Sequence, residues 1–422
     1  MDERWIIHCD CNSFYASVEL LGHPELRQKP VAVCGDPASR HGIILAKNEP
    51  AKALGVKTAE TIWQAQRKCP DLVLLEPHRQ RYVHYYKVIN EIYCRFTDRV
   101  EPFSIDESWL DVSGSWQLFA QSPKDLADRL RAQVRQATGL TISAGVSFNK
   151  VFAKLGSDYK KPDATTLITR ENFKDILWPL PAREMLFVGR SAAEKLAGMG
   201  ISTIGQLAAA DEKALAAALG KLGHTLSRYA RGLDEEPVRL WGEKEPVKSV
   251  GSGRTFPRDL VTAAEVRSAL WALSDEVAAR LRGHGLWAGA VQITLRDASL
   301  KTITRQKRLA LSTHLARDIA RAAWELAEAN WREGSPVRML TVTAQGITDQ
   351  PAAVQQSFWE DAPRPDPRRE KLERSLDAIR GRYGKGAIGA GSVLKKELGL
   401  GRLAVEERPE QDEDDQRAKG PL

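Results

Sequence analysis

The chain has 422 residues, of which 42% are hydrophobic and 28% charged, and its formal net charge is +7. This composition excludes wholesale disorder, and no apolar run approaches the roughly 18 residues of a membrane span. The length allows two to four domains. The five cysteines form no CxxC motif, and the first residues lack the pattern of a signal peptide, so we expect a cytoplasmic protein with reduced thiols.

The charge is unevenly distributed along the chain. Residues 405–422 carry seven acidic and three basic side chains, a net charge of −4, so the remaining residues carry +11. A basic body indicates a polyanionic partner such as nucleic acid, although a well-solvated surface gives the same count. We expect the acidic tail to be disordered.

The first 170 residues alternate short apolar runs with amphipathic segments, which is typical of an α/β region. Strands are predicted at 5–9, 31–34, 42–45, 101–112 and 140–146, and a long helix at 81–96. From 171 to 232 the pattern is helical, with breaks at glycines. Residues 233–246 show no periodicity and are interpreted as a linker.

Residues 247–348 change character again. The predicted order is strand, helix, strand, strand, helix, strand, which describes a four-stranded sheet with two helices on one face. The helices are expected at 262–282 and 313–331, and later strands around 291–295, 300–311 and 337–347. Prolines from 351 to 367 mark a flexible link, and a short basic helix is predicted from 368 to 383.

Three carboxylates stand in positions typical of a catalytic site. Asp10 ends an apolar strand, and Asp106 and Glu107 are adjacent in a strand-forming segment. Adjacent residues of a flat strand point to opposite faces, so both face one site only at a turn or bulge. Three close carboxylates repel unless a divalent cation neutralises them, and ligation by oxygen alone suits Mg²⁺. A capping Asp10 and a solvated turn at Asp106 remain the alternative.

Three motifs resemble those of Y-family translesion DNA polymerases, of the bacterial DNA polymerase IV type and its Gram-positive branch. Residues 10–19 (DCNSFYASVE) resemble the opening motif, and residues 104–107 (SIDE) resemble the Ser-x-Asp-Glu motif. Residues 145–155 (GVSFNKVFAKL), followed by Lys161-Pro162, resemble the block that closes the palm. The resemblance covers about residues 4 to 400. It implies template-directed, low-fidelity and poorly processive DNA synthesis past lesions.

The resemblance also implies an α+β multidomain fold shaped like a right hand. The implied parts are a palm (1–10 and 78–170), fingers (11–77), a helix-hairpin-helix thumb (171–232), a linker (233–246), an α/β little finger (247–348), a flexible link (349–404) and the acidic tail (405–422).

Roles at the metal site carry over residue by residue. Asp10 and Asp106 match the two aspartates that bridge two Mg²⁺ ions, and Glu107 matches the glutamate beside them. The backbone carbonyl of Cys11 would be a further ligand, while its thiol can simply be packed.

Roles toward the nucleoside triphosphate follow in the same way. Tyr15 matches the steric gate, whose ring rejects a 2′-OH, although a core tyrosine is the alternative. Lys161 matches a lysine that reaches the triphosphate. In the fingers, Lys52 stands where many relatives have an arginine, and Glu49 where they have a tyrosine. Lys52 keeps the charge but not the bidentate fork, so the phosphate contacts are altered.

Contacts with primer-template DNA are expected from two regions. Gly189, Arg190 and Ser191 stand in the hairpin loop of the thumb, where backbone N–H groups would meet a phosphate. Ser191 replaces a second glycine and is also a candidate helix N-cap. In the little finger, the basic residues in or near the predicted strands are Arg254, Arg296, Lys301, Arg305, Lys307 and Arg308. An ordinary solvated face is the alternative.

A peptide in the proline-flanked link resembles the motif with which bacterial polymerases bind the sliding clamp. Its anchors would be Gln355, Phe358 and Trp359. Exposed aromatic residues in a flexible link suit a binding role, but they can also pack on the chain itself. The expected partners are thus primer-template DNA, deoxynucleotides and a sliding clamp, for a monomeric protein that binds no membrane.

Other classes of protein share parts of this pattern. The chain could be the catalytic subunit of an assembly of the DNA polymerase V kind. A nucleotide cyclase has a similar palm and paired aspartates but does not need a DNA-binding thumb. A non-catalytic DNA-binding subunit would not need Asp10, Asp106, Glu107 and Lys161 together.

Overall fold

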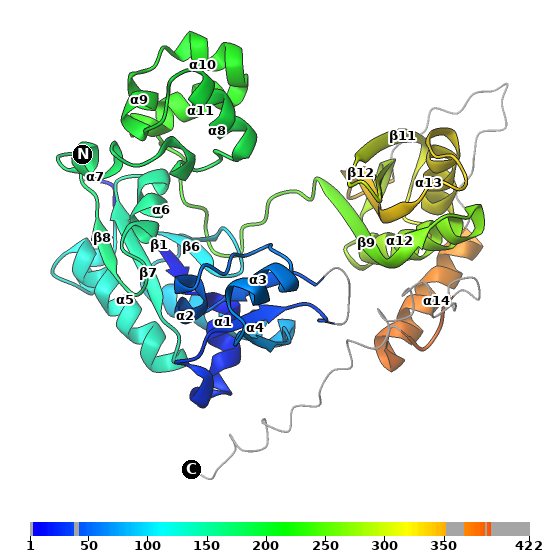
Figure 1. The fold of residues 1–422 in the computed structure, drawn as a ribbon, viewed down its shortest axis with the longest axis horizontal. Helices are drawn as coiled ribbons and strands as arrows, with labels where there is room; N and C mark the ends of the chain where they lie inside the picture. Colours follow the sequence, from blue (N-terminus) through cyan, green and yellow to red (C-terminus); the bar gives the residue numbers. More distant parts are fainter. Residues whose placement is uncertain (1–2, 38–41, 352–366, 385, 390–422) are drawn as a thin grey trace. The chain divides into compact units, whose positions relative to one another are not determined.

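The computed structural model describes residues 3–37, 42–351, 367–384 and 386–389. The predictions of a clamp-binding peptide at 355–359 and of a disordered tail at 405–422 concern residues outside these ranges. The chain separates into two compact units, 1–244 and 245–422 (Figure 1). Within the described residues, no helix combines the length and the apolar character needed to cross a bilayer.

The palm is a five-stranded sheet in the order β5-β6-β1-β7-β8. Its strands are β1 (Ile6–Cys11), β5 (Val100–Pro102), β6 (Glu107–Asp111), β7 (Ile142–Ser147) and β8 (Thr165–Leu167). The predicted strand 101–112 is therefore two strands joined by a turn. β1 lies between β6 and β7 and is antiparallel to both. This central place fixes the end of β1, where Asp10 lies.

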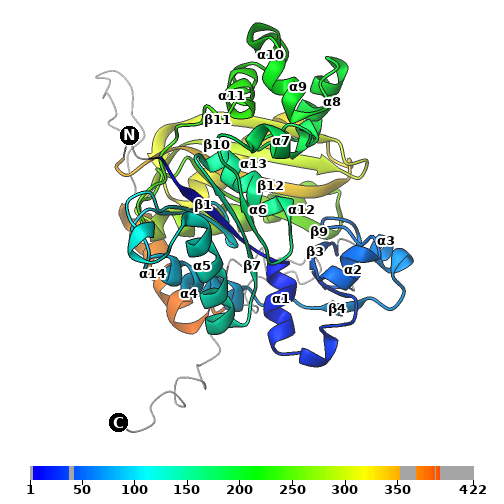
Figure 2. The ribbon, with the colours of Figure 1, turned by 90° about the vertical axis from the view of Figure 1, so that its left-hand side faces the viewer.

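Alternation along β1 sends its side chains to two different layers. Ile7 and Cys9 pack in the core with α4 (Arg79–Tyr93) and α5 (Pro123–Thr138), which contact each other (Figure 2). The opposite face meets α6 (Lys150–Tyr159). That contact is very close, because a Cβ at Gly145 of β7 would lie 1.9 Å from the Ala153 carbonyl oxygen. The short 3₁₀ turn η2 (Trp116–Leu118) precedes α5.

The fingers contain a three-stranded sheet in the order β3-β2-β4. The elements are α1 (Phe14–Leu21), η1 (Pro24–Leu26), β2 (Val31–Cys34), β3 (Ile44–Lys47), α2 (Glu49–Ala53), α3 (Ile62–Lys68) and β4 (Val73–Leu75). A separate small core of mostly aliphatic residues holds this sheet to α2 and α3.

The thumb is helical throughout, as its sequence predicts. Its elements are α7 (Phe173–Leu177), η3 (Ala182–Glu184), α8 (Arg190–Gly198), α9 (Ile204–Ala209), α10 (Glu212–Leu219) and α11 (Lys221–Ala230). Residues 233–248 form no helix or strand, but their first part packs on the palm. Val238 is fully buried, and Arg239 bonds the buried Glu101 carboxylate at 2.9 Å, which Lys150 also bonds.

The second unit follows the predicted order of elements. They are β9 (Ser249–Leu260), α12 (Ala263–Gly283), β10 (Trp287–Asp297), β11 (Thr302–Thr313), α13 (Ala316–Asn330) and β12 (Val337–Thr348). The sheet order is β11-β10-β12-β9, and α12 and α13 cover one face of it (Figure 1). This is the predicted little finger.

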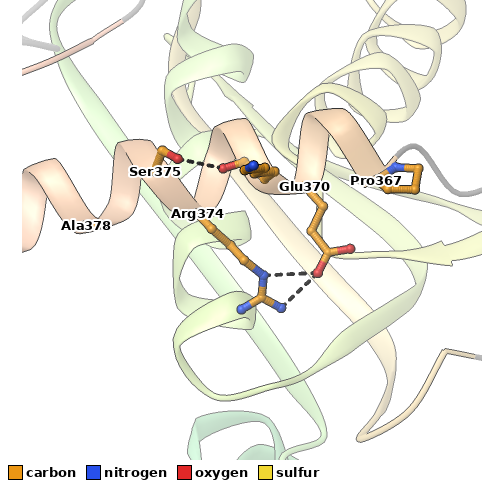
Figure 3. Close-up of a pocket in the computed structure, with 6 residues that line it drawn as sticks. Pro367, Glu370, Arg374, Ser375 and Ala378 are labelled. Carbon is orange, nitrogen blue, oxygen red and sulfur yellow. Dashed lines mark hydrogen bonds and ion pairs between the residues drawn. The ribbon is translucent and has the colours of Figure 1, made fainter.

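The predicted basic helix is present as α14 (Pro367–Tyr383). It is attached to the little finger by charge rather than by a buried apolar face. Arg282 of α12 has a side chain only 2% exposed, and it bonds Glu373 and, at 2.6 Å, Asp377 of α14. Arg374 pairs with Glu370 one turn away at 2.8 Å (Figure 3), and Glu370 also lies 3.3 Å from the buried His314 of the little finger.

Candidate active site

The three carboxylates come together because two antiparallel strands place them there. In the pair β1–β6, Asp10 lies directly opposite Glu107. Asp106 and Glu107 can face one site only if the chain bends, and the structure has such a bend just before β6. There the N–H groups of residues 103 and 104 both bond the Glu107 carbonyl, at 2.9 and 3.3 Å. Asp106 therefore lies in a turn, and its carbonyl accepts a 3.0 Å hydrogen bond from Cys11 N–H.

Two lysine ammonium groups lie on these carboxylates. Lys161 Nζ is 2.6 Å from Asp10 Oδ2, and Lys154 Nζ is 2.9 Å from Glu107 Oε2. Lys161 also pairs with Asp158 of α6 at 2.7 Å, which holds it over the site. The sequence singled out Lys161 but gave Lys154 no role. The one sequence signal for Lys154 is its place in the block that closes the palm.

Burial disfavours the charged forms of the two aspartates. Burial raises the pKa of Asp10 to about 7, because the attraction of the Lys161 ammonium does not offset desolvation. Burial also raises the pKa of Asp106, against a 2.5 Å hydrogen bond from the Ser104 hydroxyl. For Lys161 burial disfavours the ammonium, but the Asp10 and Asp158 carboxylates together outweigh it and the pKa of Lys161 is raised.

The donor set fits a hard divalent cation. Asp10, Asp106 and Glu107 offer only oxygen ligands, which magnesium prefers. A cation would stabilise the ionised forms that burial disfavours. In the described part of the chain, no group of three His, Cys, Asp or Glu side chains is already arranged to hold a metal ion. The Cys11 thiol is no ligand candidate, because burial raises its pKa well above the ordinary value.

A cavity of about 410 Å³ lies beside the carboxylates and is lined by residues of both the palm and the fingers. The predicted site residues that line it are Asp10, Cys11, Tyr15, Lys52, Asp106, Glu107 and Lys161. Lys47, Glu49 and Thr58 also line it. All the residues predicted for the metal and the nucleotide therefore share one cavity.

Tyr15 reaches this cavity through a sharp change of direction after β1. Ser13 adopts a left-handed conformation with φ 49°, and α1 begins at the next residue. The Tyr15 ring stacks on Tyr82 of α4, with ring centroids 4.1 Å apart and planes 12° from parallel. Tyr15 is half-buried, packs against the palm core and also lines the cavity.

The fingers supply two lysines rather than one. Lys52 is about half exposed and lies 3.5 Å from the Glu49 carboxylate, so the glutamate partly balances its charge. Lys47, which the sequence analysis missed, ends β3 and donates a 3.0 Å hydrogen bond to Thr58. Burial, and then the nearby Lys52 charge, lower the pKa of Lys47. Its position at a strand end was the available signal.

The thumb loop differs from the prediction in one respect. The N-cap of α8 is Gly189, not Ser191, so the proposed capping role of Ser191 is wrong. Ser191 lies in the first turn of α8, next to the exposed Arg190, which pairs with Glu194. Phe187 has φ 68°, a conformation that favours glycine. The glycine-like turn of this loop is therefore made by a phenylalanine.

Two predicted DNA-binding residues of the little finger point to its helical side. Arg305 lies opposite the buried Ile293, and its guanidinium bonds Asn330 of α13 at 2.8 Å. Lys307 lies opposite the buried Val291 and pairs with α13 at 2.6 Å. Directly opposed residues share a face of the sheet, so both belong to the helix-covered face.

The other four bases are divided between several places. Arg296 and Arg308 lie on the open face of the sheet, in register with Thr302 and Ala290. Lys301 is in the turn between β10 and β11. Arg254 lies opposite the buried Leu340, which puts it on the helical side at the edge strand β9. The predicted bases thus do not form a single patch.

Comparisons with known proteins identify the family. Residues 9–158 match the impB/mucB/samB family, residues 187–234 match "DNA polymerase-iota, thumb domain", and residues 247–358 match the impB/mucB/samB C-terminal domain. The chain is 44% identical to a protein named DNA polymerase IV from Acetivibrio thermocellus, over 95% of this chain and 100% of the relative. It is 37% identical to DNA polymerase IV 1 of Bacillus subtilis, over 93% and 94% of the two chains.

A solved structure shares the fold. A chimera titled "Y-family DNA polymerase chimera Dbh-Dpo4(243-245)-Dbh" superimposes with a TM-score of 0.72, covering 81% of this chain and 99% of the other, at 22% identity. This likeness shows that the chain has the fold of that polymerase. The chain belongs to the impB/mucB/samB family of Y-family DNA polymerases.

Proposed function

We propose that the cavity beside Asp10, Asp106 and Glu107 is the site at which this chain joins deoxynucleotides to a primer. As a Y-family member, the chain is a DNA-directed DNA polymerase that synthesises DNA past lesions. The observation that carries the assignment of the site is the single cavity shared by the three carboxylates, by Tyr15 and by lysines of the fingers. Each of these groups has a separate task in nucleotidyl transfer.

Asp10 and Asp106 would hold two Mg²⁺ ions, with Glu107 and the Cys11 backbone carbonyl as further ligands. Two ions held there would supply positive charge for activating the primer hydroxyl and for neutralising the leaving pyrophosphate. Burial raises the pKa values of Asp10 and Asp106, and a bound cation would favour the ionised forms that burial disfavours.

The lysines and Tyr15 would position the nucleotide. An ammonium has three donors, so Lys161 can bond a triphosphate oxygen while it stays beside Asp10. Lys52 would neutralise the phosphates from the fingers as a point charge, without the fork of an arginine. Tyr15 would exclude ribonucleotides by crowding the 2′ position of the sugar.

Primer-template DNA would be bound by the thumb and the little finger, outside the catalytic cavity. The thumb loop at 189–191 and the bases Arg296, Lys301 and Arg308 would contact phosphates, giving affinity without sequence preference. Further phosphate contacts would come from the helix-covered side of the edge strands β9 and β11, through Arg254, Arg305 and Lys307. The peptide at 355–359, with Gln355, Phe358 and Trp359 as anchors, would bind the sliding clamp. We further propose that the chain works as a monomer in the cytoplasm.

Primer extension tests this assignment. On undamaged and abasic templates, Asp106→Ala and Glu107→Ala should each abolish extension while primer-template binding persists. Glu91→Ala removes an exposed carboxylate of α4 outside the cavity and serves as the matched control. Extension by Asp106→Ala at a near wild-type rate would show that the metal assignment is wrong.

A further inference from the structure

Tyr15 does not stand alone behind the nucleotide cavity. Tyr82 of α4 backs it, and this second ring is 2% exposed and does not line the cavity. The two rings are stacked, at 4.1 Å and 12°. Tyr15 therefore both lines the cavity and packs on the ring of Tyr82. Any force from the cavity that pushes Tyr15 back is transmitted to Tyr82.

The hydroxyl of Tyr82 is fixed by a carboxylate. It donates a 2.5 Å hydrogen bond to Oε1 of Glu19, whose side chain is 3% exposed. Glu19 is on α1, four residues after Tyr15, so it lies one turn further along the same side of that helix. Burial and the bond to Glu19 raise the pKa of the Tyr82 phenol, so its hydroxyl stays a neutral donor.

The same carboxylate fixes the beginning of α4. Glu19 Oε1 accepts a 2.9 Å bond from His78 N–H, and Oε2 lies 2.9 Å from His78 Nδ1. A carboxylate only accepts, so Nδ1 carries the hydrogen. His78 is the N-cap residue of α4 and makes no side-chain cap of its own. Arg81, in the first turn, is 3.5 Å from Oε2.

Joining two helices through a buried carboxylate costs free energy. Its desolvation must be offset by hydrogen bonds, and an apolar side chain of similar size could pack α1 on α4 without that cost. What the carboxylate adds is a fixed point of attachment. It holds the Tyr82 hydroxyl, and with it the far end of the ring on which Tyr15 stacks.

We propose that Glu19 is a positioning residue for sugar selection: through the Tyr82 hydroxyl it holds the ring that keeps Tyr15 in the cavity. The inference rests on the proposed role of Tyr15 as the steric gate. An untethered Tyr82 ring would let Tyr15 yield to a 2′-OH, so ribonucleotides would enter more readily. A purely structural role would instead affect both kinds of nucleotide alike.

The test compares insertion of one ribonucleotide and one deoxynucleotide opposite the same template base. The readout is the ratio of the two kcat/KM values, measured for wild type, Tyr82→Phe, Glu19→Gln and Tyr15→Ala. Tyr82→Phe keeps the ring and loses only the hydroxyl, so it tests the tether even if Glu19→Gln fails to fold. We expect Tyr82→Phe to reduce the preference for deoxynucleotides about five- to tenfold, the loss of roughly one hydrogen bond. Glu19→Gln should reduce it less, because the amide oxygen can still accept from the Tyr82 hydroxyl.

Matched control variants distinguish the loss of Tyr82 positioning from a general loss of packing in the fingers and palm. Tyr86→Phe makes the same change one turn further along α4, where the ring faces Trp241 at 6.5 Å rather than Tyr15. Glu60→Gln removes another ion-paired glutamate of the fingers, bound to Lys68. Both should leave the ratio as in wild type. In the background of Tyr15→Ala, adding Tyr82→Phe should change nothing further.

Two failures can be told apart. If Tyr15→Ala removes sugar selection but Tyr82→Phe keeps the wild-type ratio, the tether is refuted and the gate stands. Equal losses for ribonucleotide and deoxynucleotide would also refute the tether, since they show a structural role only. If Tyr15→Ala itself keeps the wild-type ratio, the proposed gate is wrong and the positioning role falls with it.

Discussion

Lys161 Nζ lies 2.6 Å from Asp10 Oδ2, so an ammonium group of the protein covers the carboxylate that we propose as a metal ligand. The contact compensates the charge of Asp10, whose side chain is only 6% exposed. It also places a positive charge where the triphosphate would enter. One lysine can therefore pair with the carboxylate and with a triphosphate oxygen.

Replacing Lys161 by methionine should weaken nucleotide binding. The variant keeps most of the side-chain bulk but loses a charge-assisted hydrogen bond, which is worth about 1.5–3 kcal/mol. We expect KM for the deoxynucleotide to rise at least about tenfold, with little change in the Kd for primer-template. Steady-state insertion kinetics and fluorescence anisotropy measure the two quantities. Lys160→Met, at the exposed neighbouring position, is the control, and a loss confined to DNA affinity would assign Lys161 to the DNA instead.

Asp106→Asn should make the protein more stable while it destroys activity. The pKa of Asp106 is raised in the folded state, so above that pKa ionisation favours the unfolded chain. A neutral amide avoids this penalty, and we expect a higher midpoint of thermal unfolding at pH 7 without divalent metal. Saturating Mg²⁺ should remove the advantage, because only wild type gains from the ion. A variant less stable than wild type in metal-free buffer would contradict the electrostatic argument.

Hydrophobic patterns in the sequence predict those strands and helices whose burial depends on neighbouring residues in the chain. The apolar run of β1 and the alternation in β10 are visible in the sequence because burial of one or both faces dictates them. The acidic turn before Glu107 could not be derived, since two hydrogen bonds of the β5–β6 hairpin create it. Only the family resemblance brought Asp106 and Glu107 to one site.

Register was the other quantity that sequence reasoning could not supply. Arg305 and Lys307 look like bases of a DNA-facing strand, yet their partners Ile293 and Val291 put them on the helix-covered face. A shift of one residue would reverse this assignment. Lys154 was missed for a related reason, because its ion pair with Glu107 joins α6 to β6 across 47 residues of sequence.

The thumb loop offers a test of backbone conformation. Phe187 has φ 68°, which costs a residue with a Cβ about 1 kcal/mol and glycine almost nothing. Phe187→Gly should therefore be more stable than Phe187→Ala by about 1 kcal/mol, although both variants lose the ring. At a position with ordinary negative φ the order would be reversed. Chemical denaturation of the two full-length variants gives the difference, and an alanine variant as stable as the glycine variant would exclude the left-handed turn.

The last prediction concerns the start of α12 and its dependence on pH. Glu265 closes a capping box with Thr262, and it accepts a hydrogen bond of 2.9 Å from Val261 N–H and one of 2.5 Å from Arg258. Burial opposes its charge, but these bonds outweigh burial and lower the pKa of Glu265 to about 2. Because the folded pKa lies below the ordinary value of 4.5, the stabilisation is complete above about pH 4.5 and disappears as pH falls toward 2.

Glu265→Gln should accordingly destabilise α12 by about 0.5–1 kcal/mol near neutral pH, because the neutral amide can still close the capping box but loses the ion pair with Arg258 and the favourable negative charge in the first turn. Hydrogen exchange of the amides of α12 in the full-length chain measures this locally. The protection lost in the variant should be constant between pH 7 and pH 5.5 and should shrink below about pH 4.5. Glu276→Gln, within α12 and away from its first turn, is a control for the loss of a glutamate charge, and it should leave exchange of the first-turn amides unchanged. A difference between wild type and Glu265→Gln that persists unchanged at pH 3 would mean that the carboxylate charge is not what holds the cap.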